Sequence, residues 1–406
     1  MASVATMAQG IIMSTAGPIN RSMGGAGTAA PIDAMGALYW NPASISGLAN
    51  DEMSFGVDLL MANHRVDSSF GPLSGSTQSD PGVFPIPNVG WIHKTQNPSL
   101  TIGLGVHGVA GFKTNLPSDT QNPVLMAPPN GLGSITSEGS FLQIAPVGSL
   151  ALTDQLSVAA GPTITMGQIG VDPFVFDSPN ANGSYANGRS SRYHWGAGFQ
   201  LGTYYIVNPC WRLGASLKSP TWMETFEFYS TDANGGPRTL HTDLDLPLIL
   251  SLGTSFTNRE NLLVALDVRY FDYQNTNGLG DRATFDATGR LMGLDWSSVL
   301  STAVGMEYKL WEQTKIRCGY TYNQNPVRNS EAFFNLASPL IYQHMVSCGG
   351  SYMPTESVSM NAAYSYMLPN TRTGPIFSPL VGAIPGTSLS NHLDAHFLSF
   401  GVSVFL

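Results

Sequence analysis

The sequence predicts an all-β protein: a fourteen-stranded antiparallel transmembrane β-barrel whose N-terminal segment forms a hatch inside the lumen. Three observations predict this fold. Only 11% of the 406 residues are charged, about half the ~25% usual in soluble domains, so part of the surface is expected to face lipid. No apolar run approaches the roughly 18 residues that a transmembrane helix needs. Apolar and polar residues alternate along most of the chain after Asn50, and a membrane protein without spanning helices is a closed barrel.

The eighth candidate strand shows the alternation most clearly. In "TDLDLPLILSLGTSF" the even positions from Leu244 to Leu252 are all leucine, whereas the odd positions include aspartate, serine and glycine. One face is therefore expected to contact lipid and the other the lumen. Pro247 lies in the middle of this strand and lacks the N–H of a ladder hydrogen bond, so a local break or bulge is expected there.

About fourteen such segments occur, and single-chain outer-membrane barrels have an even number of strands. They begin near Met53, Asn88, Ser99, Ser140, Leu156, Arg192, Cys210, Leu240, Asn261, Trp296, Thr314, Leu340, Ser357 and Asn391. Short connections such as "TQNPS" and "WEQT" alternate with long Gly/Pro/Asn-rich ones, which predicts periplasmic turns and extracellular loops. Aromatic residues near strand ends are expected to form two interfacial girdles. These are Trp91, Trp195, Tyr270, Tyr308, Tyr320, Tyr352 and Tyr364.

Charge and cysteine content exclude several classes of protein. The net charge is −9 and the 18 Lys and Arg residues form no cluster, which argues against a nucleic-acid partner. The three cysteines show no C-x-x-C spacing, and their odd number excludes a complete disulfide framework. We expect no cofactor. The small residues Thr6 and Ala8 resemble an export cleavage site, so residues 1–8 are interpreted as the remnant of a signal peptide.

The stretch "RSMGGAGTAA" contains a G-x-G-x-x-A spacing typical of dinucleotide-binding turns. That motif binds a pyrophosphate only between a buried strand and a helix. Here the segment before the glycines is polar and broken by Pro18, and the segment after them is interrupted by Pro31. We therefore interpret Gly24, Gly25 and Gly27 as residues that let the chain fold tightly inside a lumen.

The segment "RSMGGAGTAAPIDAMGALYWNPASISGL" resembles the N-terminal hatch of the FadL family of outer-membrane channels for long-chain fatty acids and aromatic hydrocarbons. The family's Gly/Ala-rich stretch, acidic-Ala segment and Asn-Pro-Ala triplet match Met23–Gly27, Asp33-Ala34 and Asn41-Pro42-Ala43. "LDLPLILSLGTSF" and "PLIYQHMVSCGGSYMPTESVSMNAAYSY" also resemble the family, so the likeness spans the chain. One departure is Phe405, which is penultimate where such barrels commonly end in an aromatic residue.

The resemblance implies a hatch over residues 1–48, a barrel over 49–406 and a location in the outer membrane of a diderm bacterium. It implies a gating role for hatch residues, although turn initiation alone also explains Asn41-Pro42. The candidate gating residues are Gly24, Gly25, Gly27, Asp33, Asn41, Pro42 and Ala43. By position, "LTIGLGVHGVAGF" matches the family strand whose inward kink opens a lateral gap. Gly103, Gly105 and Gly108 are expected to form that kink or to make room for the hatch.

Two sets of residues are candidates for ligand binding. Val124, Leu125 and Met126 lie in an apolar, Pro-rich loop, where they either form a capture groove or pack within the loop itself. Lys218 and Arg269 are expected to point inward, where a cation can bind a buried carboxylate. Pairing with lumen aspartates is the alternative for both.

The expected function is passive uptake of hydrophobic compounds, with long-chain fatty acids favoured and aromatic or alkane hydrocarbons as the alternative. A lipid-hydrolysing barrel would need a catalytic motif, and none is found; a porin would need charged lumen rings. His392 and His396 flank Asp394 but lie about 13 Å apart along a strand, too far for one metal ion to bind all three. The expected partners are hydrophobic small molecules, outer-membrane lipid and the barrel-assembly machinery, and we expect a monomer.

Overall fold

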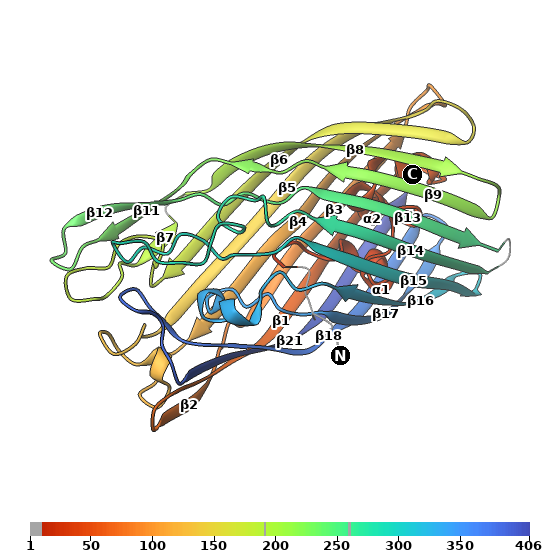
Figure 1. The fold of residues 1–406 in the computed structure, drawn as a ribbon. Coiled ribbons are helices and arrows are strands. Elements are labelled where there is room, and N and C mark those ends of the chain that lie inside the picture. Colours follow the sequence, from red (N-terminus) through yellow and green to blue (C-terminus); the bar gives the residue numbers. More distant parts are fainter. Residues whose placement is uncertain (1–9, 191, 259–260) are drawn as a thin grey trace.

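The computed structural model describes residues 10–190, 192–258 and 261–406. These residues form a closed antiparallel barrel (Figure 1), and β1 pairs with β21 to close it. Fourteen strands make the wall: β1 (Glu52–Phe70), β3 (Val83–Lys94), β4 (Leu100–Leu116), β5 (Ile135–Ala151), β6 (Leu156–Asp172), β8 (His194–Ile206), β9 (Trp211–Lys218), β13 (Ile249–Thr257), β14 (Leu262–Phe271), β15 (Val299–Trp311), β16 (Thr314–Asn323), β17 (His344–Thr355), β18 (Val358–Gly374) and β21 (Thr387–Phe405). The predicted fold class is confirmed. The interpreted signal-peptide remnant lies outside the described residues.

The two ends of the barrel differ as the sequence predicts. Short turns join β3 to β4, β5 to β6, β8 to β9, β15 to β16 and β17 to β18. The other end, at the left of Figure 1, carries long connections with small elements of their own. These elements are β2 (Leu73–Gln78), η2 (Pro123–Leu125), β7 (Gly188–Ser190), β10 (Trp222–Met223), β11 (Phe226–Thr231), β12 (Pro237–Thr242), η3 (Asn329–Glu331), η4 (Phe333–Asn335), β19 (Phe377–Ser378) and β20 (Gly382–Ala383). We call the two ends the turn end and the loop end.

The wall strands place alternate residues outside and inside. Leu266 and Val268 of β14 are exposed on the outer face, whereas the intervening Asp267 is fully buried. Most of the predicted girdle residues also point outward; Trp195 and Tyr352, for example, are exposed. In the part of the chain that the structure describes, no helix has the length and apolarity needed to span a membrane.

Three wall strands begin five or more residues from their predicted starts. The second begins at Val83 rather than near Asn88, the fourth at Ile135 rather than near Ser140, and the eighth at Ile249 rather than near Leu240. Pro247 interrupts the ladder: residues 243–248, between β12 and β13, form no strand and contribute an isolated bridge between Leu246 and Thr221. Leu246 is consequently buried inside the barrel, whereas its place in the leucine alternation predicts that it faces lipid.

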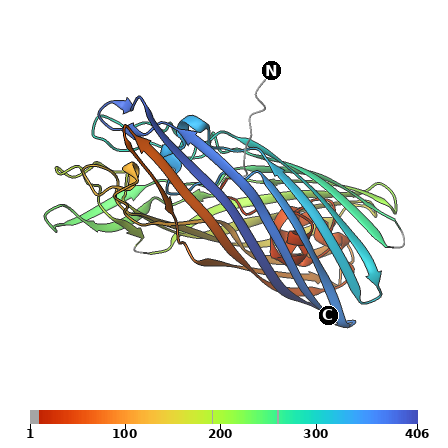
Figure 2. The same ribbon diagram turned by 90° about the horizontal axis from the view of Figure 1, so that it is seen from below.

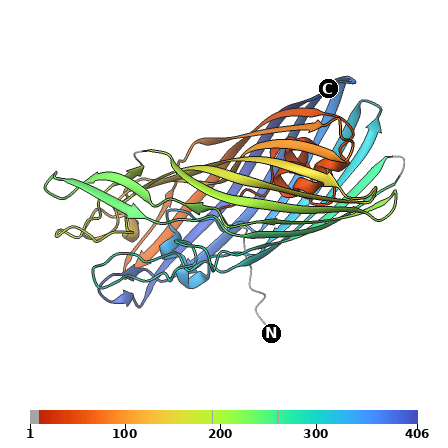
Figure 3. The ribbon, with the colours of Figure 1, turned by 90° about the horizontal axis from the view of Figure 1, so that it is seen from above.

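The N-terminal segment lies inside the barrel, where its short helices stand between the walls (Figures 2 and 3). It contains α1 (Gly17–Ser22), α2 (Ala34–Trp40) and η1 (Pro42–Gly47). From residue 10 to residue 45 nearly every side chain is buried. We call residues 10–48 the hatch.

Candidate functional site

Three carboxylates of the wall hold the hatch. Asp58 of β1 binds the Arg21 guanidinium through both oxygens, at 3.1 Å from Nε and 2.9 Å from Nη2. Asp267 of β14 accepts hydrogen bonds from the backbone N–H groups of Gly27 and Thr28, at 2.8 and 2.9 Å. Glu52 of β1 accepts one from the backbone N–H of Ala34 at 3.1 Å. Such charge-assisted bonds are about twice as strong as neutral ones, so the hatch is attached at defined points.

Asn41 connects two parts of the hatch to the wall. Its Nδ2 donates to the Thr28 carbonyl at 2.8 Å and to the Thr203 carbonyl of β8 at 2.9 Å. Its Oδ1 accepts from the backbone N–H of Ala43 at 3.1 Å, which caps η1 at Pro42. The Asn-Pro-Ala triplet therefore begins a helical turn, and Asn41 joins the hatch to β8. Its role in gating stays a prediction.

Two of the three glycines predicted to take part in gating occupy backbone conformations that other residues adopt rarely. Gly24 has φ +62° and Gly25 has φ +84°. A Cβ on Gly24 would lie 2.8 Å from the backbone nitrogen of Tyr320, and one on Gly25 would lie 2.4 Å from the Ser14 carbonyl oxygen. Glycine is required here because the hatch backbone turns tightly against β16.

Asp33 begins the second hatch helix. Its side chain accepts a hydrogen bond from the backbone N–H of Gly36 at 3.2 Å and so caps α2. Burial, followed by the nearby Glu52 carboxylate, raises the pKa of Asp33 to about 7. A hatch residue that titrates near neutral pH makes hatch docking sensitive to pH.

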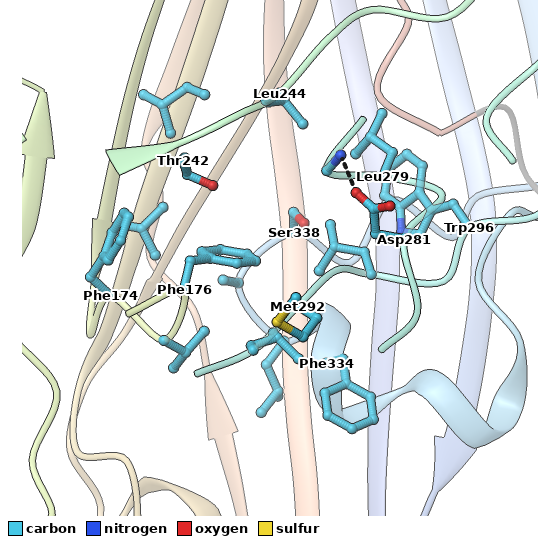
Figure 4. Close-up of a pocket in the computed structure, with 18 of the residues that line it drawn as sticks. Phe174, Phe176, Thr242, Leu244, Leu279, Asp281, Met292, Trp296, Phe334 and Ser338 are labelled. Carbon is cyan, nitrogen blue, oxygen red and sulfur yellow. Dashed lines mark hydrogen bonds between the residues drawn. The ribbon is translucent and has the colours of Figure 1, made fainter. Parts of the chain in front are cut away.

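Above the hatch, at the loop end, lies an apolar cavity of about 620 Å³, which we call the vestibule pocket (Figure 4). Its walls come from the segment after β6, the loop between β14 and β15, and η4. They include Phe174, Phe176, Leu279, Met292, Trp296 and Phe334. The volume lies within the 300–1,000 Å³ range of small-molecule sites. The charged residues that line the pocket are Asp243, Asp281, Arg282 and Arg290, and both arginines are exposed.

The floor of the vestibule pocket is the start of the hatch. Ile11 lines it and is 2% exposed. Below Ile11 lies a second cavity of about 70 Å³, which we call the side pocket, and the two cavities share Ile11, Phe112 and Leu340. The side pocket extends to Phe84 of β3 and Gly111 of β4. Three side chains thus separate the vestibule from a cavity at the barrel wall.

The wall is interrupted beside the side pocket. Pairing between β3 and β4 ends at Asn88 and His107, although both strands continue toward the loop end. The Thr95 N–H donates to the Leu100 carbonyl in the same register, so every second residue back along β3 directs its N–H toward β4. Pro85 and Pro87 occupy two of these positions and have no N–H.

The hatch pairs with the edge of β4 that β3 leaves unpaired. The Met13 N–H donates to the Val109 carbonyl at 2.9 Å, and the Gly111 N–H donates to the Ile11 carbonyl at 3.3 Å. Between them Ile12 bridges Ala110. The first residues of the hatch therefore cover the wall interruption and form the pocket floor at the same time.

Comparison with known proteins identifies the family. The family model described as outer membrane protein transport protein (OMPP1/FadL/TodX) matches residues 1–403. The chain belongs to this family. The FadL/TodX family comprises outer-membrane transport proteins and not enzymes, which confirms the predicted location and class. No match was found among curated proteins.

Solved structures of the FadL/TodX family share the fold. A Pseudomonas aeruginosa FadL homologue has a TM-score of 0.75 and 16% identity, over 98% of this chain and 99% of that chain. The toluene transporter TodX of P. putida has a TM-score of 0.71 and 17% identity, over 97% and 99%. The Ralstonia pickettii toluene transporter TbuX has a TM-score of 0.65 and 17% identity, over 97% and 99%.

Within this FadL-type barrel the three β4 glycines that were predicted to form the kink have different surroundings. The ladder is regular at Gly103 and Gly105, which pair with both β3 and β5. A Cβ on Gly103 would lie 2.7 Å from Leu38 of the hatch, so this glycine makes room for α2. The register between β4 and β5 shifts between Gly108 and Ala110, which places the strand irregularity at Gly108.

The predicted ligand-binding residues do not line the two pockets. Val124 and Leu125 are 3% and 0% exposed, because η2 packs its side chains into the loop-end core; Met126 follows η2 directly. The same loop reaches the vestibule pocket through Leu132. Arg269 is buried against the hatch: it pairs with Asp267, donates to the Gly25 carbonyl at 2.6 Å and lies over the Trp40 ring.

Lys218 points inward as expected, with Nζ 4.1 Å from the centroid of the Tyr39 ring. It therefore lies beside α2 of the hatch, deeper than the vestibule pocket. No sequence signal marks Ile11 as the pocket floor, since it is one of three adjacent apolar residues, Ile11-Ile12-Met13, and nothing in the sequence distinguishes it from the other two. Pro85 and Pro87 do carry a signal, because two prolines at alternate positions of a strand mark an edge.

Proposed function

We propose that this protein is a passive channel for hydrophobic compounds, which enter the vestibule pocket, displace the start of the hatch and leave sideways between β3 and β4. One observation carries the proposal: the vestibule pocket and the side pocket share Ile11, Phe112 and Leu340, and the side pocket reaches the interrupted wall. Each methylene group removed from water contributes about 0.8 kcal/mol. A hydrophobic solute therefore moves from water to the pocket and on to lipid without an energy source.

We further propose that long-chain fatty acids, or related amphiphiles, are the preferred substrates. The exposed Arg282 and Arg290 at the vestibule pocket suit a carboxylate that stays in contact with water while the alkyl chain enters the apolar cavity. Lys218 offers a second cation deeper in the lumen. Arg269 is already paired with Asp267, so in this conformation we assign it to holding the hatch.

Uptake of aromatic or alkane hydrocarbons is the second candidate. Phenylalanine and tryptophan side chains form much of the vestibule pocket, and aromatic faces and edges suit a planar apolar ring. Two of the similar solved structures are described as toluene transporters. An uncharged hydrocarbon would need none of Arg282, Arg290 and Lys218.

The test compares the two ligand classes on the same variants. Arg282→Met with Arg290→Met, and Lys218→Met separately, are assayed for binding and uptake of a long-chain fatty acid and of toluene. We expect both to weaken the acid and to leave toluene unchanged. If these variants bind and take up both ligands as well as the wild type does, hydrocarbons become the better assignment. Arg269→Met serves as a comparison, because loosening the hatch should alter the passage of both ligands together.

A separate variant tests the channel itself. Phe334→Asp places a charge in the wall of the vestibule pocket, and an unpaired carboxylate in an apolar cavity is costly. Both ligands should then bind more weakly. Leu380→Asp is the matched control, because Leu380 is 93% exposed at the loop end and lines neither pocket. Unchanged binding of both ligands by Phe334→Asp would contradict capture in the vestibule pocket.

A further inference from the structure

Two of the three cysteines face each other on the outer wall. Cys318 of β16 and Cys348 of β17 are direct partners in the antiparallel ladder. Both are exposed on the lipid-facing side, and both are free thiols in this structure. The third cysteine, Cys210, lies just before β9, and β13, β14 and β15 separate β9 from β16 around the barrel.

The hydrogen bonds of this ladder define the type of pair that the two cysteines form. The Asn323 N–H donates to the Gln343 carbonyl at 2.8 Å, so residues 323 and 343 are a hydrogen-bonded pair. Hydrogen-bonded and non-hydrogen-bonded pairs alternate along an antiparallel ladder. The register between β16 and β17 has no shift, and Cys318 lies an odd number of positions from Asn323. Cys318 and Cys348 are therefore a non-hydrogen-bonded pair.

The other end of the ladder gives the same result. The Met353 N–H donates to the Gln313 carbonyl at 2.9 Å in the same register, and Gln313 also lies an odd number of positions from Cys318. In a non-hydrogen-bonded pair the Cα atoms are about 4.5 Å apart and the side chains lie close. A disulfide needs Cα atoms about 4.4–6.8 Å apart. The ladder thus places the two cysteines on one face at a backbone spacing that a disulfide can bridge.

We propose that Cys318 and Cys348 form a disulfide that joins β16 to β17. An outer-membrane protein crosses the periplasm, which is an oxidising compartment. One cysteine thiolate attacks the disulfide of a periplasmic thiol oxidase and forms a mixed disulfide. The second thiolate displaces the oxidase sulfur, so that two electrons and two protons pass to the oxidase, which leaves as a dithiol.

The lipid face determines when the bond forms. Lipid keeps a water-soluble thiol oxidase away from thiols on this face. The bond therefore forms after β16 and β17 have paired and before lipid covers that face, and lipid then shields it from water-soluble reductants. It closes the segment 319–347, which contains η4 and with it Phe334 of the vestibule pocket. Closing this segment restricts the unfolded chain and fixes the register of the two strands.

The test counts free thiols in the full-length protein made in cells with an intact periplasm. Acid precipitation of the cells stops thiol exchange, and a maleimide mass tag is then added in denaturant, with and without prior reduction. We expect one tag without reduction, on Cys210, and three after reduction. Peptide mapping should show Cys318 linked to Cys348. Cys210→Ser should carry no tag before reduction and two after it. Three tags on the unreduced wild type would overturn the proposal.

A matched control keeps the number of cysteines on the lipid face. Cys348→Ser with Val346→Cys moves one thiol to the diagonal position, because Val346 pairs with Tyr320. Diagonal neighbours are about 7–8 Å apart, beyond the reach of a disulfide at about 7 Å. This variant should carry three tags without reduction, as should the wild type from cells that lack the oxidase. Heat-modifiable gel migration verifies that each protein is folded, and one tag on the control would also overturn the proposal.

Discussion

Arg21 of the hatch and Asp58 of the wall form a two-point ion pair, with Nε–Oδ1 and Nη2–Oδ2 distances of 3.1 and 2.9 Å. Their side chains are 1% and 0% exposed. The Arg21 guanidinium also lies 4.0 Å from the centroid of the Phe397 ring. Two charges that are buried together become costly when either is left alone. Release of α1 from the wall therefore requires that water enter the lumen with it.

Asp58→Asn should open the hatch. The substitution leaves the buried Arg21 charge without its partner, which costs about 3–5 kcal/mol, so the docked hatch is destabilised. We expect a higher single-channel conductance in planar bilayers. Asp67→Asn is the control on the same strand, since Asp67 pairs with Arg65 where both side chains are more than a third exposed and such pairs contribute about 0–1 kcal/mol. Equal conductance of the two variants would contradict the anchoring role of Asp58.

Deletion of residues 9–48 should convert a nearly closed protein into one with a large conductance, because the hatch occupies the lumen. Asn41→Ala should have a smaller effect: it removes the bonds to the Thr28 and Thr203 carbonyls but leaves the three wall carboxylates in place. Conductance recordings of both proteins, with folding verified by heat-modifiable gel migration, test whether the deletion has the larger effect. A truncated barrel that conducts no more than the intact protein would show that residues 9–48 do not close it.

The alternation of apolar and polar side chains predicted the barrel strands, because this pattern depends only on residues that are neighbours in the sequence. Leu250 and Leu252 lie on a regular strand and face lipid, as predicted. Leu246 continues the same pattern in the sequence, yet it is buried, because Pro247 ends the ladder and tertiary contacts then decide where the chain goes. The resemblance of the segment around Asn41-Pro42-Ala43 to the FadL-family hatch likewise predicted a hatch inside the barrel. Its glycines and turn residues shape the backbone over short distances, so the local sequence records them.

The residues around the pockets depended on long-range contacts that no local pattern records. Arg269 points inward as expected and pairs with Asp267 of its own strand, one of the lumen aspartates expected as its alternative partners, whereas its hydrogen bond to the Gly25 carbonyl reaches the distant hatch. Val124 is buried because η2 folds back into the loop-end core. Ile11, in the floor of the vestibule pocket, follows Gly10, which packs against Tyr273 and Trp296 from far along the chain. Apart from Asp267, sequence reasoning identified the kinds of residue but not their neighbours.

Hatch opening should depend on pH through Asp33. Burial and Glu52 raise its pKa to about 7 in the docked hatch, compared with about 3.9 in water. Between these two values the docked state holds a proton that the released state has lost, so docking weakens as pH rises by up to about 1.4 kcal/mol per unit. We expect more frequent open events at pH 7.5 than at pH 5.

Asp33→Asn isolates this effect because asparagine also caps helices but does not ionise. The variant should show the same frequency of open events at both pH values. Asp154→Asn, in the exposed turn between β5 and β6, should behave as the wild type. A pH dependence that persists in Asp33→Asn would assign the titration to another group beside it, such as Glu52.

Restoring the missing hydrogen-bond donors of β3 should close the wall. Pro85 and Pro87 lie where β3 directs its N–H groups toward β4, and β4 instead binds Ile11 and Met13 of the hatch. Pro85→Val with Pro87→Val supplies two donors. At about 1 kcal/mol for each hydrogen bond, the closed wall would be favoured by roughly tenfold or more. Uptake of a hydrophobic compound into the membrane should fall by a similar factor, while its binding in the vestibule pocket should persist.

Pro162→Val is the control, because Pro162 lies within β6 and lines neither pocket. This variant should leave uptake unchanged. If the Pro85/Pro87 variant takes up its ligand as fast as the wild type, the substrate does not leave between β3 and β4, and passage past the whole hatch to the periplasm becomes the better account.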